Sequence, residues 1–342
     1  MPNPIASNKI ACTLVTRVNQ LFHDLTQASF DSEHRYRHRV ERLFWNKVAN
    51  VIPNPSRRPH QSLVVVDLAC GTGFATQLLG YRLGSQDQLI AIDVTESALK
   101  TTARRWASIR RSDGMVPQLE RLAGDGQALA LADRCVDLVA MNAALHHVPD
   151  PKATLREIDR ILKPGGWFAL GFEPNRTHFA SPPMAALSRG LDRAAWYASP
   201  RQNMRRVRRF LGKDTSKNQY TDAPDHDVLA ACINEQLLQE GIITEPLTSN
   251  TLLDLVDPHA RGAEDAAGFD PVQLLRDVMP DYIVHRLFSS DYLGETGRRS
   301  VIVRCIADAA FRCFLPQHGS LFCWMIRKPG PSLFEECRCR LR

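Results

Sequence analysis

Apolar residues along this chain follow two patterns: short unbroken runs, and longer stretches with helical spacing. Three of the unbroken runs end in a polar side chain, at Val64–Asp67, Gln88–Asp93 and Asp137–Asn142. Runs of this kind, rich in Val, Ile and Leu, are typical of strands buried on both faces of a parallel sheet. Between them, apolar positions three and four residues apart predict helices. The alternation of strands and helices favours an α/β fold.

The first of these strands leads into a tight turn. Gly71 and Gly73 follow Asp67, and the stretch from Phe74 onward has the pattern of a helix. Glycine lets the backbone turn sharply and lets a ligand approach without meeting a Cβ atom. The free N–H groups at the start of a helix face the same place. We therefore expect a nucleotide-type pocket at the carboxyl ends of parallel strands.

This turn differs from a dinucleotide fingerprint. Thr76 stands where G-x-G-x-x-G/A requires its last small residue, which disfavours a pyrophosphate site and an NAD(P)-dependent enzyme. The spacing Asp67-x-x-x-Gly-x-Gly instead resembles the first motif of the class I S-adenosylmethionine (SAM)-dependent methyltransferases. In that family the turn lies against the cofactor, so the resemblance implies that Asp67, Ala69 and Thr72 lie there with the two glycines.

Two later acids stand where the resemblance implies cofactor contacts. Asp93, followed by Val94, ends the second strand 20 residues beyond Gly73, the place of a bond to the ribose hydroxyls. Asp125 and Gly126 form a turn after a short strand, the place where the family holds adenine. An acid at a helix start is the structural alternative for Asp93, and an ordinary Asp-Gly turn is the alternative for Asp125.

The fourth strand supplies the candidate catalytic residues. It ends at Asn142, a further cofactor contact by resemblance, and continues into Ala-Ala-Leu-His146-His147. This segment resembles the one that lies beneath the reactive methyl group in the family. His146, His147 and Glu173, at the end of the fifth strand, all lie at carboxyl ends of predicted strands, where ligands bind. A histidine can accept a proton near neutral pH, although the pair can equally form a wall of the pocket.

The motifs lie within residues 62–173, and their position suggests how the chain is divided into domains. We expect an N-terminal helical cap (1–60) of two helices, a SAM-binding core (61–174), a substrate-recognition insertion (175–280), strands and a helix that complete the core (281–330), and a tail (331–342). The expected fold is a Rossmann-like, seven-stranded, mostly parallel sheet. Its last strand is antiparallel and at the edge, and a helical insertion follows strand five.

Composition bears on the class of protein, the state of its cysteines and its cellular location. The chain has 342 residues, of which 44% are hydrophobic and 23% charged, and a net charge of +6, as in an ordinary globular protein. Its nine cysteines lack metal-type spacing. We find no secretory signal and no apolar run long enough to span a membrane. We therefore expect free thiols, no metal and a cytoplasmic location.

The resemblance is to the methyltransferase type 11-like branch that includes the ubiquinone/menaquinone methyltransferases. It implies that SAM donates a methyl group to the oxygen or carbon of a small molecule, with an amphipathic or quinone-like acceptor among the candidates. RNA or protein methylation and a non-catalytic SAM-binding scaffold are the alternatives. A nucleic-acid substrate is disfavoured because Asn142 is not followed by Pro-Pro-aromatic and no Pro-Cys dipeptide occurs.

An arginine-rich run covers residues 201–209. Arg205, Arg206, Arg208 and Arg209 belong to it. Such a run is either the solvated face of a helix or a transient contact for an anionic ligand or an acidic membrane surface.

Overall fold

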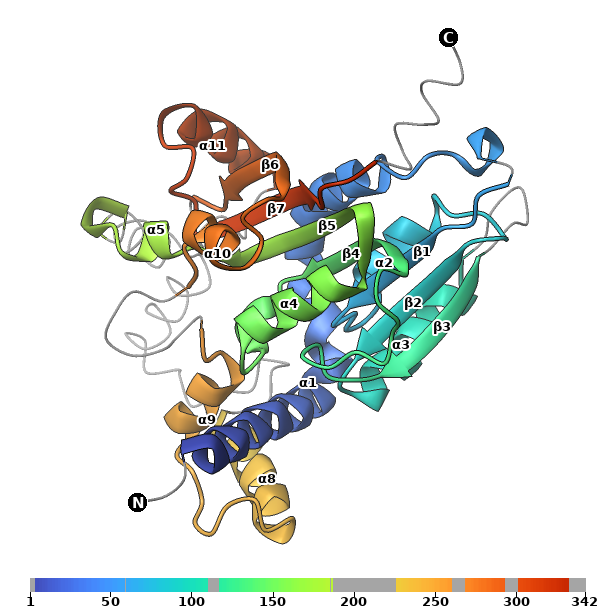
Figure 1. The fold of residues 1–342 in the computed structure, drawn as a ribbon. Helices are drawn as coiled ribbons and strands as arrows, with labels where there is room; N and C mark the ends of the chain where they lie inside the picture. Colours follow the sequence, from blue (N-terminus) through green and yellow to red (C-terminus); the bar gives the residue numbers. More distant parts are fainter. Residues whose placement is uncertain are drawn as a thin grey trace, which may run out of the picture.

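The computed structural model describes residues 4–58, 60–109, 117–184, 186, 226–259, 268–292 and 301–331. Within them one seven-stranded sheet has the order β3-β2-β1-β4-β5-β7-β6 (Figure 1). Its strands are β1 (Val64–Leu68), β2 (Gln88–Asp93), β3 (Gln118–Ala123), β4 (Val136–Asn142), β5 (Leu162–Pro174), β6 (Ile283–Ser290) and β7 (Leu321–Arg327).

The direction of the strands confirms the expected Rossmann-like sheet. Strands β1 to β5 pair in parallel, and β7 pairs antiparallel with both β5 and β6. The expected edge position of the last strand is wrong, because β7 lies between β5 and β6. The reason is burial. The apolar run of β7 is buried over its five central residues, whereas β6 carries His285 and Arg286 and leaves its first four residues exposed.

Helices connect and cover these strands. They are α1 (Pro4–Ala49), α2 (Phe74–Gly80), α3 (Glu96–Ala107), α4 (Pro151–Ile161), α5 (Arg176–Phe179), α8 (His226–Gln239), α9 (Ser249–Val256), α10 (Pro271–Val278) and α11 (Val301–Phe314), with short 3-10 helices η1 (Pro55–Arg57) and η2 (Leu145–His147). The start of α4 shows how the sequence sets such boundaries. Asp150 accepts a hydrogen bond from the Ala153 amide, and Pro151 occupies the first helical position.

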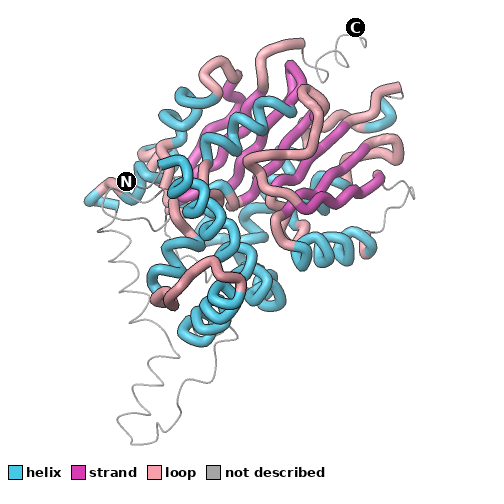
Figure 2. Tube along the Cα trace, turned by 60° about the horizontal axis from the view of Figure 1, so that its bottom comes forward, coloured by secondary structure: helices cyan, strands magenta, loops and turns pink. Residues whose placement is uncertain are grey.

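Alternate strand residues contribute to two separate cores. Val66 and Val139 face the cluster that includes the apolar side of α4. Val65 and Leu138 face the cluster formed with α2 and the second half of α1. Because successive strand residues point to opposite faces, the unbroken apolar runs bury both sides of the sheet. The result is a helix–sheet–helix arrangement, seen with helices (cyan) on both sides of the strands (magenta) in Figure 2.

The N-terminal cap differs from the expectation of two helices. Residues 4–49 form one continuous helix, α1, of 46 residues. The segment where a break was expected contains neither proline nor glycine, so nothing in it stops a helix. Val18 and Leu21 in the first half pack with α8 and α9, beside which α1 lies in Figure 1. The second half packs on the sheet, so α1 links the insertion to the core.

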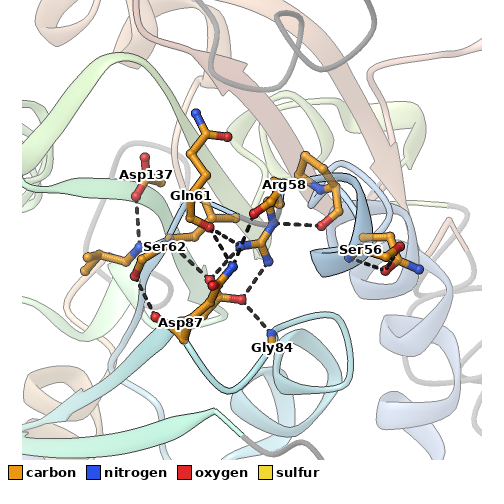
Figure 3. Close-up of polar contacts among 12 residues, drawn as sticks. Ser56, Arg58, Gln61, Ser62, Gly84, Asp87 and Asp137 are labelled. Atoms are coloured by element: carbon orange, nitrogen blue, oxygen red, sulfur yellow. Dashed lines mark hydrogen bonds and ion pairs between the residues drawn. The ribbon is translucent and has the colours of Figure 1, made fainter. Parts of the chain in front are cut away.

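A buried ion pair fixes the end of the sheet opposite the strands' carboxyl ends (Figure 3). Both nitrogens of the Arg58 fork donate to Asp87, at 2.6 Å each, and both side chains are fully buried. Asp87 also accepts the backbone amides of Leu63 and Gly84. These bonds tie the chain before β1 to the turn before β2, and the bidentate geometry satisfies both charges.

The helices of the insertion pack against the rest of the protein at two places. Helices α8 and α9 pack on α1, and α10 packs on α4. The arginine-rich run at 201–209 and residues 332–342 of the expected tail lie outside the described residues. Among the described helices, none combines the length and the apolar character that crossing a membrane would need.

Candidate functional site

A cavity of about 420 Å³ lies at the carboxyl ends of β1, β2 and β4. Residues of the glycine turn, the ends of β2 and β4 and the loop after β3 form its floor. Helix α1 contributes Asn19, Phe22 and His23 to its wall, and α9 with the residue after it contributes Val256 and Asp257. A volume of this size suits a small-molecule ligand. The cavity contains every predicted cofactor residue except Gly73.

The backbone at this cavity adopts conformations that side chains usually avoid. Ala69 and Gly71 have φ of 53°, and Ala143, directly after β4, has φ of 50°. Non-glycine residues in this region cost free energy and cluster at functional sites. A Cβ atom added to Gly71 would have no atom within 4 Å, so this glycine opens toward the cavity. The turn therefore offers bare backbone to a ligand.

Gly73 has a packing role, and its role as a cofactor residue stays a prediction. It has φ of 79°, precedes α2 and does not line the cavity. A Cβ atom here would lie 2.9 Å from the side chain of Thr102 on α3. The second glycine of the motif thus lets α3 approach the turn closely.

Asp93 lies at the tip of β2, between the glycine turn and Thr95. One accepts the Gly71 amide at 2.9 Å, and the other accepts the amide and the hydroxyl of Thr95. Burial raises its pKa, and the hydrogen bonds from Thr95 and Gly71 oppose that shift. A carboxylate has about four acceptor sites, so Asp93 keeps capacity for roughly one further donor such as a ribose hydroxyl. The ribose role remains a prediction.

Asp67 and Thr76 form a buried pair beneath the turn. The Thr76 hydroxyl donates to Asp67 Oδ2, and both side chains are almost fully buried. Burial raises the pKa of Asp67 to about 7, partly opposed by the Thr76 hydrogen bonds. Thr76, which departs from the dinucleotide fingerprint, is thus the partner of the motif's acid.

Three more predicted cofactor residues line the cavity with their polar groups partly engaged. The Val94 carbonyl accepts Gln20 of α1 at 3.1 Å. Asp125 accepts the Gln127 amide at 3.0 Å, which stabilises its own turn, and Gly126 lies beside it. The contact of Asp125 and Gly126 with adenine and the contact of Val94 with the cofactor stay predictions.

Asn142 is held by the N-terminal cap. Its Oδ1 accepts Trp45 Nε1 at 2.8 Å, and its Nδ2 donates to Glu41 at 3.2 Å. The amide is therefore a fixed part of the cavity wall. Neither Trp45 nor Glu41 was recognised from the sequence, where they look like ordinary positions of an amphipathic helix.

Glu173 is brought to His146 but not to the cavity. It is fully buried and accepts the amides of Ala144, Leu145 and His146 at 2.8 to 3.1 Å. Its Oε2 also lies 2.8 Å from His146 Nδ1. Glu173 therefore shapes the loop after β4 and orients His146, and its place among the candidate catalytic residues stays a prediction.

His147 is paired with a residue that the sequence did not reveal. Its Nδ1 lies 3.0 Å from Asp257 Oδ1 and 2.8 Å from the Val256 carbonyl. The ring of His23 packs edge-on against it, with 5.0 Å between centroids. Asp257 follows an apolar helix far along the chain, and nothing in its sequence context marks it as a site residue.

Fit to SAM can be judged from the cavity itself. The exposed backbone at Gly71 leaves a cradle for a ligand. Within the described residues, Asn19 Oδ1 and Gln27 Nε2 are buried polar atoms without a hydrogen-bond partner, and both residues line the cavity. An acceptor and a donor that are both unsatisfied suit a ligand with amino and carboxylate groups, such as the methionine part of SAM. The residues present fit this cofactor.

Comparison with known proteins agrees with this geometry. Residues 66–170 match the family model described as methyltransferase domain. The core of this chain is a methyltransferase domain. The domain is of the SAM-dependent kind, so its cofactor is S-adenosylmethionine. The match covers β2, β3 and β4 and most of β1 and β5, so it includes the residues that form the floor of the cavity.

Relatives of the methyltransferase domain include enzymes of quinone biosynthesis. The chain is 27% identical over 176 residues to the ubiquinone/menaquinone biosynthesis C-methyltransferase UbiE of Cronobacter sakazakii, covering 50% of this chain and 64% of that protein. It is 37% identical over 102 residues to UbiE of Xylella fastidiosa strain M23, covering 30% and 39%. These alignments span less than two thirds of either relative.

Solved structures that match this chain are more distant in sequence. A SAM-dependent methyltransferase from Aquifex aeolicus is 14% identical, with 78% of this chain and 80% of that chain covered and a TM-score of 0.34. This likeness is too remote to bear on substrate or mechanism.

Proposed function

We propose that this protein is a methyltransferase that moves a methyl group from SAM to an oxygen or carbon of a small molecule. The observation that carries the proposal is one continuous cavity. It runs from the glycine turn at Gly71 and Asp93 to the histidine pair after β4, with α1 and α9 as its outer wall. A cofactor on the turn would place a second ligand beside the histidines.

The protein's own part in this reaction is positioning. SAM, when bound, supplies a methyl group already activated by its sulfonium. Asp93 and the Gly71 turn would hold the adenosyl side, and Asn19 and Gln27 of α1 would bind the methionine side. Holding two reactants in line supplies much of a rate enhancement, and a closed wall keeps water out.

The part of the cavity beside the histidine pair, where the methyl acceptor would bind, suits an amphipathic molecule. Phe22, Leu253 and Val256 give it apolar walls, whereas His146 and His147 form a polar end. The relatives' names concern C-methylation in ubiquinone and menaquinone biosynthesis. A quinone-like acceptor, with an apolar body and ring oxygens, fits both considerations. We further infer a reducing, cytoplasmic setting, because the six cysteines whose side chains the structure describes are free thiols.

Transfer of labelled methyl groups tests this proposal. Purified protein would be incubated with methyl-labelled SAM and, separately, with a small-molecule extract, RNA and a protein fraction. We expect label in organic-soluble small molecules and an equal amount of S-adenosylhomocysteine (SAH). Label confined to RNA or protein would overturn the small-molecule acceptor. SAH binding without transfer to any fraction would instead favour a scaffold.

A further inference from the structure

The two histidines of η2 are held by different carboxylates. His146 Nδ1 lies 2.8 Å from Glu173 Oε2, and His147 Nδ1 lies 3.0 Å from Asp257 Oδ1. The two rings are close, with 4.0 Å between centroids. Glu173 belongs to β5 and Asp257 follows α9, so core and insertion each hold one ring.

The contacts of Glu173 fix the tautomer of His146. Three backbone amides donate to this carboxylate, so it is an acceptor on all sides and takes the Nδ1–H of the imidazole. The lone pair of His146 is therefore on Nε2. That nitrogen lies 3.9 Å from Asp257 Oδ1, beyond hydrogen-bond range, and His146 lines the cavity. Nε2 is free to accept a proton from a ligand.

We propose that His146 Nε2 is the general base for the acceptor, that Glu173 is its positioning residue, and that the acceptor is a hydroxylated aromatic or enol. This inference rests on the proposed methyl transfer and specifies its substrate class. Both rings are held through Nδ1, His146 by Glu173 and His147 by Asp257 and the Val256 carbonyl, so what separates them is the protonation that these partners favour.

The surrounding charges support different protonation states for the two rings. Burial and the neighbouring His147 lower the pKa of His146, although Glu173 and Asp257 oppose this. Burial also lowers the pKa of His147, but the hydrogen bond and charge of Asp257 outweigh it and raise the pKa. His23 of α1 packs on His147, and the His259 amide donates to the His146 carbonyl. A pair of groups pushed apart in pKa is the usual sign of an acid–base site.

The chemistry of the step limits the acceptor. As an acceptor oxygen forms its bond to the methyl carbon, the methyl–sulfur bond breaks, sulfur keeps the electron pair, and the hydroxyl proton passes to His146 Nε2. For methylation at carbon, loss of the same proton makes an adjacent ring carbon nucleophilic. That carbon later releases its own proton, the oxygen is reprotonated, and one proton is released net. A neutral amine attacks with its own lone pair and needs no base in this step, so it is not the substrate expected here.

Kinetic assays with simple hydroxylated aromatic acceptors test whether His146 is the general base. We would assay SAM with a panel of alkylated hydroquinones and catechols, comparing wild type, His146→Ala and Glu173→Gln. His60→Ala, an exposed histidine outside the cavity, is the matched control. We expect His146→Ala to lower kcat by about 10²–10⁴-fold, with SAH affinity within about twofold of wild type and partial rescue by added imidazole. Glu173→Gln should move the acidic limb of the pH profile.

Three outcomes overturn the proposal. One is a His146→Ala enzyme with wild-type kcat and pH profile. Another is transfer to amines but to no hydroxylated probe. The third is transfer that stops on chelation and returns with a divalent cation. One ligand atom each from His146, His147 and Asp257 lies within 4.8 Å of the others, and an ion there would use the same Nε2 lone pair.

A titration of the histidines, which needs no methyl acceptor, tests the His146–Glu173 dyad independently of the proposed methyl transfer. Histidine titrations by NMR should place the pKa of His146 below the ordinary value and that of His147 above it. Glu173→Gln should lower the pKa of His146 further, since the carboxylate favours the imidazolium. A His146 that titrates like a free histidine in both proteins contradicts the dyad. Wild type that neither binds SAH nor transfers methyl contradicts the proposed function instead, whatever the titrations show.

Discussion

Gly71 and Gly73 look equivalent in the motif but differ in their surroundings. Both have positive φ, at 53° and 79°. Gly71 faces open space at the cavity, whereas a Cβ on Gly73 would lie 2.9 Å from Thr102. Spacing alone predicted the turn correctly but could not assign the two roles, because the role of Gly73 depends on how closely α3 approaches.

Alanine at each glycine should separate these roles. Gly73→Ala combines backbone strain with overlap against Thr102, so we expect about 1–3 kcal/mol lower stability. Gly71→Ala carries the strain without the overlap, but its methyl group enters the cavity, so SAH affinity should fall more than stability. Urea denaturation and calorimetric SAH titration measure the two effects. A larger stability loss at Gly71 than at Gly73 would be inconsistent with the packing described.

The buried Asp67 should leave a signature in the pH dependence of stability. Its pKa in the folded protein is about 7, above the ordinary value of 3.8. The folded state therefore binds more protons than the unfolded state between these values, and stability attributable to Asp67 falls as pH rises through this window. Above about pH 7 the loss is complete.

Asp67→Asn keeps an acceptor for Thr76 but cannot ionise. The variant-minus-wild-type difference in unfolding free energy should therefore increase from pH 5 to pH 8. Asp281→Asn, at an exposed turn, is the control for loss of an acidic group. A difference for Asp67→Asn that stays flat over this pH range would show that the Asp67 carboxyl is ionised throughout.

Among the elements, those buried on both faces were the most predictable. β1, β2 and β4 are unbroken apolar runs and were recognised with their polar ends. The continuity of α1 was missed because its two halves face different partners, α8 and α9 for one and the sheet for the other. The position of β7 inside the sheet was also missed, since a local pattern shows burial of a strand but not its neighbours.

The Arg58–Asp87 pair should be a main anchor between the elements. Arg58→Ala leaves the buried Asp87 without its charge partner, which typically costs about 3–5 kcal/mol. Arg57→Ala removes an exposed arginine next to it and should change stability by less than about 0.5 kcal/mol. Urea unfolding of the two variants tests the difference. Similar stabilities would mean that the buried pair contributes little.

At the scale of the whole molecule, the site is assembled from segments distant in sequence. The floor was predictable because strand ends of a parallel sheet meet at one edge. The walls were not, because Asn19 on α1 and Asp257 after α9 come to line the same cavity only when the insertion folds onto the cap. Asn19 Nδ2 donates to the carbonyls of His147 and Leu255, at 3.3 and 3.1 Å, and so joins cap, core and insertion.

Binding of SAH tests the central claim, that this assembled cavity is a SAM site. Calorimetric titration would compare wild type with Asp93→Ala and with Asp281→Ala, which changes an exposed acid that does not line the cavity. We predict binding by wild type and the control, and weakening by about 1–3 kcal/mol in Asp93→Ala, as for a lost hydrogen bond to a charged group. Absence of binding by wild type at millimolar SAH, or equal affinity in Asp93→Ala, would contradict the account.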